Sequence, residues 1–183
     1  MSKLIVTADV HGSYSSWLTI KALLSYNDND KLVIAGDLFD TRYGNFSNTD
    51  FQPESIKKEL KKFNHDVYYV YGNCDVPSFF PGYKVKTAFN AFNRQVFLHH
   101  GHRSCKDFPG SDIIIQGHTH YYSLLKKHGQ IVMNPGSITY PKSGTATYGV
   151  IDNNSAYIVE LETGNRLISM ELPNTLKSRR KMT

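Results

Sequence analysis

The N-terminal part of the chain alternates short apolar runs with segments in which apolar side chains recur at helical spacing. The apolar runs, residues 3–8, 31–36 and 66–72, predict three buried strands. Residues 13–24 and 53–63 have helical spacing and begin with Ser13 and Pro53, which helix N-termini prefer. This alternation of strands and helices predicts a parallel sheet with helices packed against it.

From residue 83 onward the pattern changes to short strand-like runs separated by turn residues. These runs predict eight further strands, at residues 83–89, 93–100, 112–117, 121–127, 130–134, 145–152, 156–161 and 165–172. Turn residues at 127–130, 152–154 and 163–165 indicate hairpins. We therefore expect an α/β fold, a two-sheet β-sandwich of mixed parallel and antiparallel strands flanked by helices. Residues 1–176 would form a single domain, and residues 177–183 a short basic tail.

Composition and charge narrow the class of protein and its partners. Hydrophobic residues make up 40% of the 183 residues and charged residues 20%, which is typical of a globular domain. No apolar run approaches the roughly 18 residues that span a bilayer, so we expect no membrane partner. Two cysteines are too few for a disulfide framework, which fits a cytoplasmic location. Residues 177–183 carry four of the five net positive charges, which is more typical of a solvated terminus than of a nucleic-acid-binding arm.

Acids, histidines and amides follow the apolar strands at the points where the strands end. They form five clusters, each beside a glycine: Asp9 and His11; Asp37 and Asp40; Asn73 and Asp75; His100 and His102; His118 and His120. Each residue alone is as readily a turn former, a helix cap or a hydrogen-bonded surface residue. Five clusters together imply repeated burial of polar groups at one edge of the sheets, which bound metal would compensate.

Imidazole, carboxylate and amide ligands favour a transition metal, and their number favours two ions. Because paired thiolates are missing from the clusters, a structural zinc site is not expected, and manganese, iron, zinc and nickel all suit the set. In a two-metal site the ions lie about 3.5–4 Å apart and share a bridging ligand. On an extended segment, His118 and His120 would point to one side about 6–7 Å apart, so that each imidazole serves one ion.

The clusters resemble the motifs of the calcineurin-like metallophosphoesterase superfamily. The matching motifs are D-x-H (Asp9, His11), G-D-x-x-D (residues 36–40), G-N-x-D (residues 72–75), the strand-end His100, and G-H-x-H (residues 117–120). The short length, the HGH at residues 100–102 and the NPGS at residues 134–137 are similar to its small bacterial phosphodiesterase branch, relatives of the retromer scaffold subunit. The resemblance runs from residue 1 to about residue 150 and implies a metal-dependent phosphodiesterase.

The resemblance implies that seven residues hold two divalent ions, with manganese expected and zinc, iron or nickel as alternatives. Asp9, His11 and His120 would bind the first ion, and Asn73, His100 and His118 the second. Asp37 would bridge both ions together with a hydroxide that attacks phosphorus in line. Asp40 would orient a ligand histidine, with a plain turn role as the alternative. Asp37, Asn73 and Cys74 would then be the catalytic residues.

Cys74 departs from the family pattern, in which a histidine at this position protonates the leaving group of phosphomonoesters. A thiol with an ordinary pKa of about 8.5 is a weaker candidate for that transfer, and a small buried side chain is an equal alternative. We expect Cys74, Asp75 and Arg42 to line the substrate site, with Asp75 or His102 as alternative proton donors. For Arg42, a solvated surface position is the alternative.

The expected substrate is a small phosphodiester or a nucleotide-like one. The alternative is a protein-binding scaffold that kept the fold and lost the chemistry, as the retromer relative has done. Cys74 favours the scaffold, and the complete ligand set argues against it. An exposed strand edge in the second half of the chain would allow a homo-oligomer.

Overall fold

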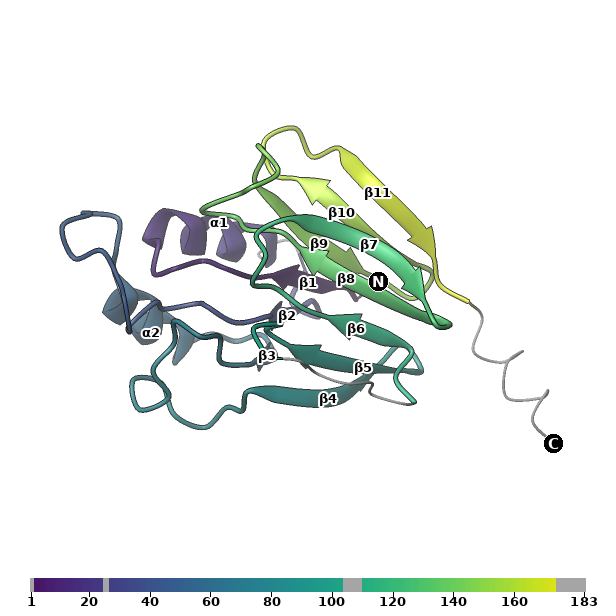
Figure 1. Cartoon of the computed structure of the whole chain (residues 1–183), viewed down its shortest axis with the longest axis horizontal. Coiled ribbons are helices and arrows are strands. Elements are labelled where there is room, and N and C mark those ends of the chain that lie inside the picture. The colour runs from purple at the N-terminus through teal and green to yellow at the C-terminus, as the bar shows by residue number, and fades with distance from the viewer. Residues whose placement is uncertain (1, 25–26, 104–109, 174–183) are drawn as a thin grey trace.

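The computed structural model describes residues 2–24, 27–103 and 110–173, which form two helices and eleven strands. The helices are α1 (Tyr14–Leu24) and α2 (Pro53–Leu60). The strands are β1 (Leu4–Thr7), β2 (Lys31–Ile34), β3 (Val67–Tyr69), β4 (Lys86–Ala91), β5 (Arg94–His99), β6 (Ile113–Ile115), β7 (Tyr122–Lys127), β8 (Gln130–Pro135), β9 (Thr147–Ile151), β10 (Ser155–Glu160) and β11 (Arg166–Glu171). They build two sheets packed face to face, ordered β11-β10-β9-β1-β2-β3 and β4-β5-β6-β8-β7 (Figure 1).

The six-stranded sheet has a parallel centre and an antiparallel flank. Strand β1 pairs in parallel with β2, and β2 with β3, while β9 and β10 continue the sheet in antiparallel pairing. Every residue of β1 is buried, because both faces of this strand are covered. Its side chains alternate: Leu4 and Val6 join the core between the sheets, and Ile5 joins the core under the helices.

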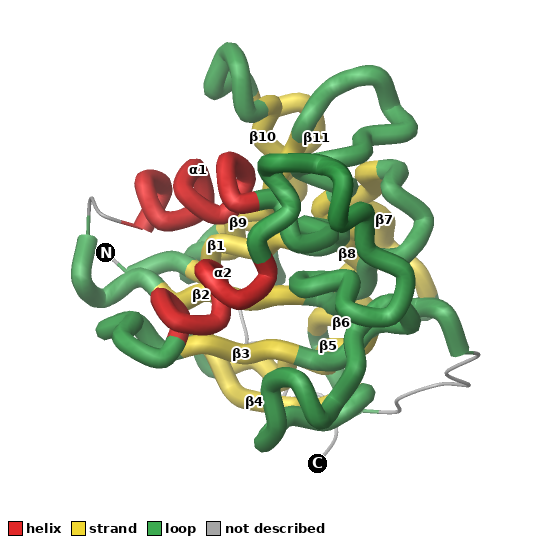
Figure 2. Tube along the Cα trace, turned by 90° about the vertical axis from the view of Figure 1, so that its left-hand side faces the viewer, coloured by secondary structure: helices red, strands yellow, loops and turns green. Residues whose placement is uncertain are grey.

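Both helices cover the outer face of the six-stranded sheet (Figure 2). Helix α1 buries Trp17, Ile20 and Leu24, which recur at the spacing of one helix face. Helix α2 begins at Pro53 and buries Ile56 and Leu60 against the same core. The helices therefore cover the parallel strands on the side away from the five-stranded sheet.

The five-stranded sheet brings its strand ends to the same edge as the six-stranded sheet. Strands β5, β6 and β8 run parallel, with β4 and β7 paired antiparallel at the outer positions. Gly117, just after β6, lies so close to Ala8 and Ala35, just after β1 and β2, that a methyl group on it would collide with both. The loops that follow β1, β2 and β6 thus meet in one place.

The predicted sandwich of mixed sheets flanked by helices is confirmed. All eleven predicted strands and both predicted helices are present, with differences of a few residues at their ends. The three predicted hairpins join β7 to β8, β9 to β10 and β10 to β11. Neither of the two described helices is long and apolar enough to cross a membrane. The predicted tail, residues 177–183, lies outside the described residues.

Candidate metal centre

Tight turns after β1 and β2 place the first acids and histidine of the candidate site. Asp9, His11 and Asp37 all have left-handed backbones, with φ of 54°, 51° and 50°. Hydrogen bonds between the two turns hold these conformations: the Asp9 N–H donates to the Gly36 carbonyl (3.1 Å) and the His11 N–H to that of Asp37 (2.9 Å). Because such conformations are costly for residues with a side chain, their recurrence marks a site whose geometry is fixed by its surroundings.

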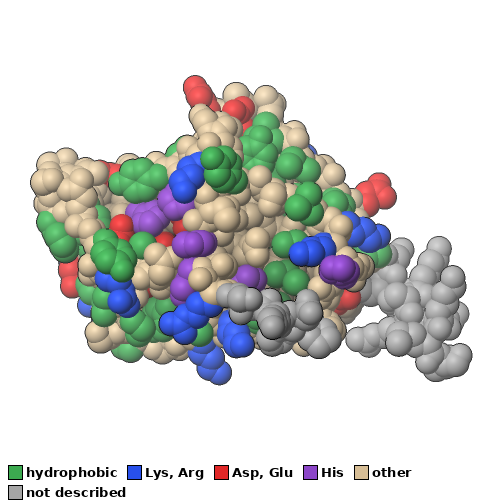
Figure 3. Space-filling model, in the orientation of Figure 1, with side chains coloured by type: hydrophobic (Ala, Val, Ile, Leu, Met, Phe, Trp, Pro, Cys, Tyr) green, Lys and Arg blue, Asp and Glu red, His purple; other side chains and the backbone are tan. Residues whose placement is uncertain are grey.

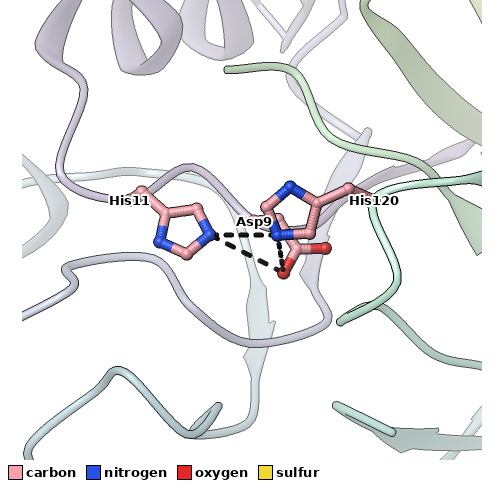
Figure 4. Close-up of side chains that lie close together, drawn as sticks. All are labelled: Asp9, His11 and His120. Carbon is pink, nitrogen blue, oxygen red and sulfur yellow. Dashed lines mark hydrogen bonds and ion pairs between the residues drawn. The ribbon is translucent and has the colours of Figure 1, made fainter. Parts of the chain in front are cut away.

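One group of candidate ligands is formed by Asp9, His11 and His120, whose ligand atoms all lie within 4.8 Å of one another. The Asp9 Oδ1 lies 3.6 Å from the His120 Nε2 and 4.0 Å from the His11 Nε2 (Figure 4). The two Nε2 atoms are 3.3 Å apart. Residues separated by more than a hundred positions in the chain thus point three ligand atoms at one small volume.

A second group is formed by Asp37, His100 and His118, whose ligand atoms also lie within 4.8 Å of one another. The His100 Nε2 lies 3.0 Å from the Asp37 Oδ2 and 3.2 Å from the Asn73 Oδ1, so the predicted amide ligand belongs to this group. The same Nε2 is 4.0 Å from the Asp9 Oδ1 of the first group. The two groups are therefore neighbours, and the structure brings together all seven residues predicted as ligands.

The local conformation predicted for His118 and His120 is wrong. These residues lie on a bend after β6 with φ of 72° and 62°, not on an extended segment. The bend is held by the His118 N–H, which donates to the Asp9 Oδ2 (3.0 Å), and by the Asn134 amide, which donates to the Gly117 carbonyl (2.9 Å). The two imidazoles still fall in different groups, because the bend separates them.

Hydrogen bonds fix the rings of three histidines with Nε2 turned toward the site. The Nδ1 atoms of His100 and His120 donate to the carbonyls of Ala35 (2.7 Å) and Tyr140 (2.8 Å). The His11 Nδ1 lies 3.0 Å from the Asp40 Oδ2, which is the contact predicted for Asp40. A partner on Nδ1 selects the tautomer whose Nε2 lone pair is free, as a metal ligand requires.

The pKa values of the Asp9 and Asp37 carboxyl groups are shifted in opposite directions. Burial raises the pKa of Asp9 to about 7, since this side chain is wholly inaccessible and its Oδ1 has no hydrogen-bond partner among the described residues. Burial also acts on Asp37, but a hydrogen bond from His100 in its charged form, with protons on both ring nitrogens, and one from the Cys74 N–H (2.8 Å) outweigh it and lower its pKa to about 2. A bound metal ion would replace the proton on the His100 Nε2. An unpartnered, buried carboxylate oxygen surrounded by imidazole nitrogens fits a metal ion, which supplies the missing positive charge.

The residues predicted to line the substrate site lie in three different environments. Cys74 is buried beside Asp37 and Asn73, and burial raises the pKa of its thiol far above the ordinary value, which makes proton donation harder. Asp75 is buried and accepts hydrogen bonds from the N–H groups of Gly72 (3.0 Å) and Phe39 (2.9 Å), so its described contacts hold two loops together. Arg42 has an exposed side chain, and its N–H donates to the Cys74 carbonyl (3.0 Å).

Two residues of the NPGS sequence hold the site together, a role that the sequence analysis missed. The wholly buried Ser137 donates from its hydroxyl to the Asp9 carbonyl (2.8 Å), and Asn134 holds the bend that carries His118. The NPGS motif was visible in the sequence and could have indicated that these residues matter. Their role in holding the site depends on the turn after β8 lying beside the turn after β1, which the sequence does not show.

Comparisons with known proteins agree with this arrangement. The family model described as the calcineurin-like phosphoesterase superfamily domain matches residues 2–156. Phosphodiesterase YfcE of Escherichia coli strain K12 is 29% identical over 172 residues, which cover 88% of this chain and 93% of YfcE. The solved structure of YfcE, a phosphoesterase from E. coli, matches with a TM-score of 0.82 at 26% identity over 93% of this chain and 100% of its own.

More distant solved structures share the fold. Vacuolar Protein Sorting 29 from Cryptosporidium parvum has a TM-score of 0.66 at 19% identity, covering 94% of this chain and 98% of its own. Vps29 from Entamoeba histolytica, solved in complex with Zn²⁺, has a TM-score of 0.62 at 18% identity, covering 93% and 99%. The resemblance expected from the motifs is confirmed, because the family model spans most of the chain. The protein belongs to the calcineurin-like phosphoesterase superfamily.

Proposed function

We propose that this protein is a two-metal-dependent phosphodiesterase. The observation that carries the proposal is the pair of adjoining ligand groups around Asp9 and Asp37, each closed by imidazole Nε2 atoms. The likeness to phosphodiesterase YfcE over most of both chains supports the same activity.

In this proposal Asp9, His11 and His120 hold one divalent ion, and Asn73, His100 and His118 hold the other, with Asp37 between them. The low pKa of Asp37 keeps this residue ionised at neutral pH, as a ligand shared by two cations must be. The two groups adjoin where the His100 Nε2 of the second group lies 4.0 Å from the Asp9 Oδ1 of the first. We expect manganese, with zinc, iron or nickel as alternatives.

Bound divalent ions would lower the pKa of a water molecule to give a hydroxide for in-line attack and would offset negative charge on the phosphoryl oxygens. The chain's own contribution is orientation. Asp40 and the carbonyls of Ala35 and Tyr140 keep three imidazole rings fixed. The Cys74 N–H fixes the carboxylate of Asp37. These contacts are made within the protein, and groups fixed in this way are what electrostatic preorganisation requires.

The proposed substrate is a phosphodiester with a good leaving group, either small or nucleotide-like. The thiol of Cys74 is the group nearest to the family's proton donor, but its raised pKa makes it a poor acid, so substrates that need little protonation are favoured. The exposed Arg42, anchored to the same loop, is the proposed contact for a phosphate oxygen. Two cysteines in the whole chain also fit a cytoplasmic enzyme.

The test is hydrolysis of bis(4-nitrophenyl) phosphate by protein stripped with a chelator and then supplied with one divalent metal at a time. We expect turnover with manganese, and a loss of at least about 1,000-fold in kcat for Asp37→Asn. Asp66→Asn is the matched control, because Asp66 is an exposed acid that pairs with Lys31 away from the site. Turnover that is equal with and without metal, or unaffected by Asp37→Asn, would refute the proposal.

A protein-binding scaffold is the second candidate function. Cys74 in place of the family's histidine and the shared fold of the Vps29 proteins favour it. The scaffold predicts no turnover with any divalent metal, in protein whose metal content after dialysis is far below two ions per chain.

A further inference from the structure

The loop between β8 and β9 is hydrogen-bonded directly to the candidate metal ligands. The Tyr140 carbonyl accepts from the His120 Nδ1 (2.8 Å), and the Lys142 N–H donates to the His120 carbonyl (3.2 Å). The Tyr140 N–H donates to the Ser137 hydroxyl (2.9 Å), which itself donates to the Asp9 carbonyl. The backbone of Tyr140 is thus fixed relative to Asp9 and His120.

The side chain of Tyr140 is nevertheless exposed. It has 49% of its surface accessible, and its ring centroid lies 5.5 Å from that of His11, with the planes inclined by 55°. A single exposed aromatic ring is ordinary on a protein surface. This ring differs because its backbone is anchored on both sides and its centroid lies 5.5 Å from that of His11, a candidate metal ligand. Its backbone therefore does not need to be ordered when a substrate binds.

A positive charge accompanies the ring. Lys142 is exposed, two residues along the same loop. The N–H of this residue donates to the His120 carbonyl (3.2 Å), so the residue that carries the charge lies directly beside a candidate metal ligand. On the face drawn in Figure 3, most of the visible histidines gather in one area, with basic and hydrophobic side chains beside them.

We propose that Tyr140 and Lys142 form a substrate-binding wall that selects phosphodiesters carrying an aromatic group, such as a nucleobase or an aryl ring. Tyr140 stacks against the aromatic group, and Lys142 faces the negative charge of the phosphate. The inference rests on the proposed function, because the wall borders the proposed metal centre and specifies what that centre cleaves. It assigns the substrate class to two residues outside the family motifs.

Binding of two phosphonates to the manganese-loaded protein tests the wall without requiring turnover. Phenylphosphonate and methylphosphonate carry the same charged group, so the ratio of their dissociation constants, measured by calorimetry, isolates the contact with the ring. We expect phenylphosphonate to bind about tenfold more tightly to the wild type. Tyr140→Ala reduces the preference to nearly one, Tyr140→Phe keeps it, and Lys142→Met weakens both ligands by a similar factor.

Leu125→Ala is the matched control, because Leu125 is an apolar residue of β7 that is 59% exposed and is not part of the wall. It should leave the ratio unchanged. Equal preference in the wild type and in Tyr140→Ala would overturn the inference, even if bis(4-nitrophenyl) phosphate is hydrolysed. A preference that depends on Tyr140 in a protein without turnover would instead support the wall and refute the proposed hydrolysis. Thermal unfolding confirms that each variant is folded.

Discussion

Replacing Asp9 by asparagine should stabilise the protein without metal and destabilise it relative to wild type when metal is present. Burial raises the pKa of Asp9 from 3.8 to about 7 in the folded protein. A carboxyl group whose pKa is higher in the folded than in the unfolded protein favours folding only in its protonated form. The free energy of unfolding therefore falls as the pH rises from about 4 to about 7. About three pKa units correspond to about 4 kcal/mol above pH 7. Asparagine has nearly the same shape and no charge, so it avoids this loss.

The expected result is a reversal of order. In a chelator at pH 8, Asp9→Asn should be more stable than wild type by up to about 4 kcal/mol, and the difference should shrink at pH 5. With manganese at about 1,000 times its dissociation constant, the wild type should gain about 4 kcal/mol. The variant should gain much less, since it lacks the carboxylate whose Oδ1 faces His11 and His120.

Urea denaturation at pH 5 and pH 8, with chelator or with manganese, measures all four free energies of unfolding. Asp30→Asn is the control, because Asp30 is a buried acid outside the site whose Oδ1 accepts from the Lys3 N–H (2.8 Å) and the Asn27 amide (3.1 Å). It should be destabilising, with the same response to manganese as wild type. If metal-free Asp9→Asn is no more stable than wild type at pH 8, or if manganese stabilises both proteins equally, the reasoning is wrong.

Three further substitutions test other parts of the structure. A methyl group at residue 72 would collide with the carboxylate and N–H of Asp37, so Gly72→Ala should weaken manganese binding at least tenfold by calorimetry; unchanged affinity would contradict the close approach. Cys74→His supplies the imidazole of the family pattern, and we expect the ratio of phosphomonoester to phosphodiester kcat/KM to rise about tenfold; no rise would show that residue 74 does not reach the leaving group. Hydrogen bonds from Lys21 (2.7 Å) and Tyr14 lower the pKa of Glu59 to about 2, so its stabilisation is complete above pH 4.5 and is lost as the pH falls toward 2. Glu59→Gln should therefore cost about 1 kcal/mol at pH 7, after allowance for screening, and progressively less below pH 4; a cost independent of pH would mean that the charge does not matter.

The sequence was sufficient to predict the elements because their patterns are local. The alternation at the start of the chain is a property of neighbouring residues, and it predicted the parallel pairing of β1, β2 and β3. Which sheet each later strand joins was not predictable from the same pattern. Strands β9 to β11 return to extend the first sheet, while β4 to β8 form the second. That division depends on which apolar faces are left to bury, and no single run of residues contains this information.

The identities of the candidate ligands were predicted, but their conformations were not. A strand ending in His118 and His120 suggests an extended chain, whereas the bend is imposed by Asp9 and Asn134 from other loops. The burial of Asp75 was missed for the same reason, because the N–H groups that surround its carboxylate come from loops after two different strands. Contacts between distant turns determine these details.

The strained backbone at the centre indicates that the site is formed before metal binds. Six of the nine described non-glycine residues with positive φ are Asp9, His11, Asp37, Asp40, His118 and His120. Each such conformation costs on the order of 1–3 kcal/mol and persists only where surrounding contacts require it. Those contacts come from the protein itself, through hydrogen bonds such as Asp9 N–H to Gly36 and Ser137 hydroxyl to Asp9. The protein's own hydrogen bonds therefore order the ligands, so that their ordering does not weaken metal binding. The main unfavourable free energy that an ion relieves on binding is that of burying the charge of Asp9.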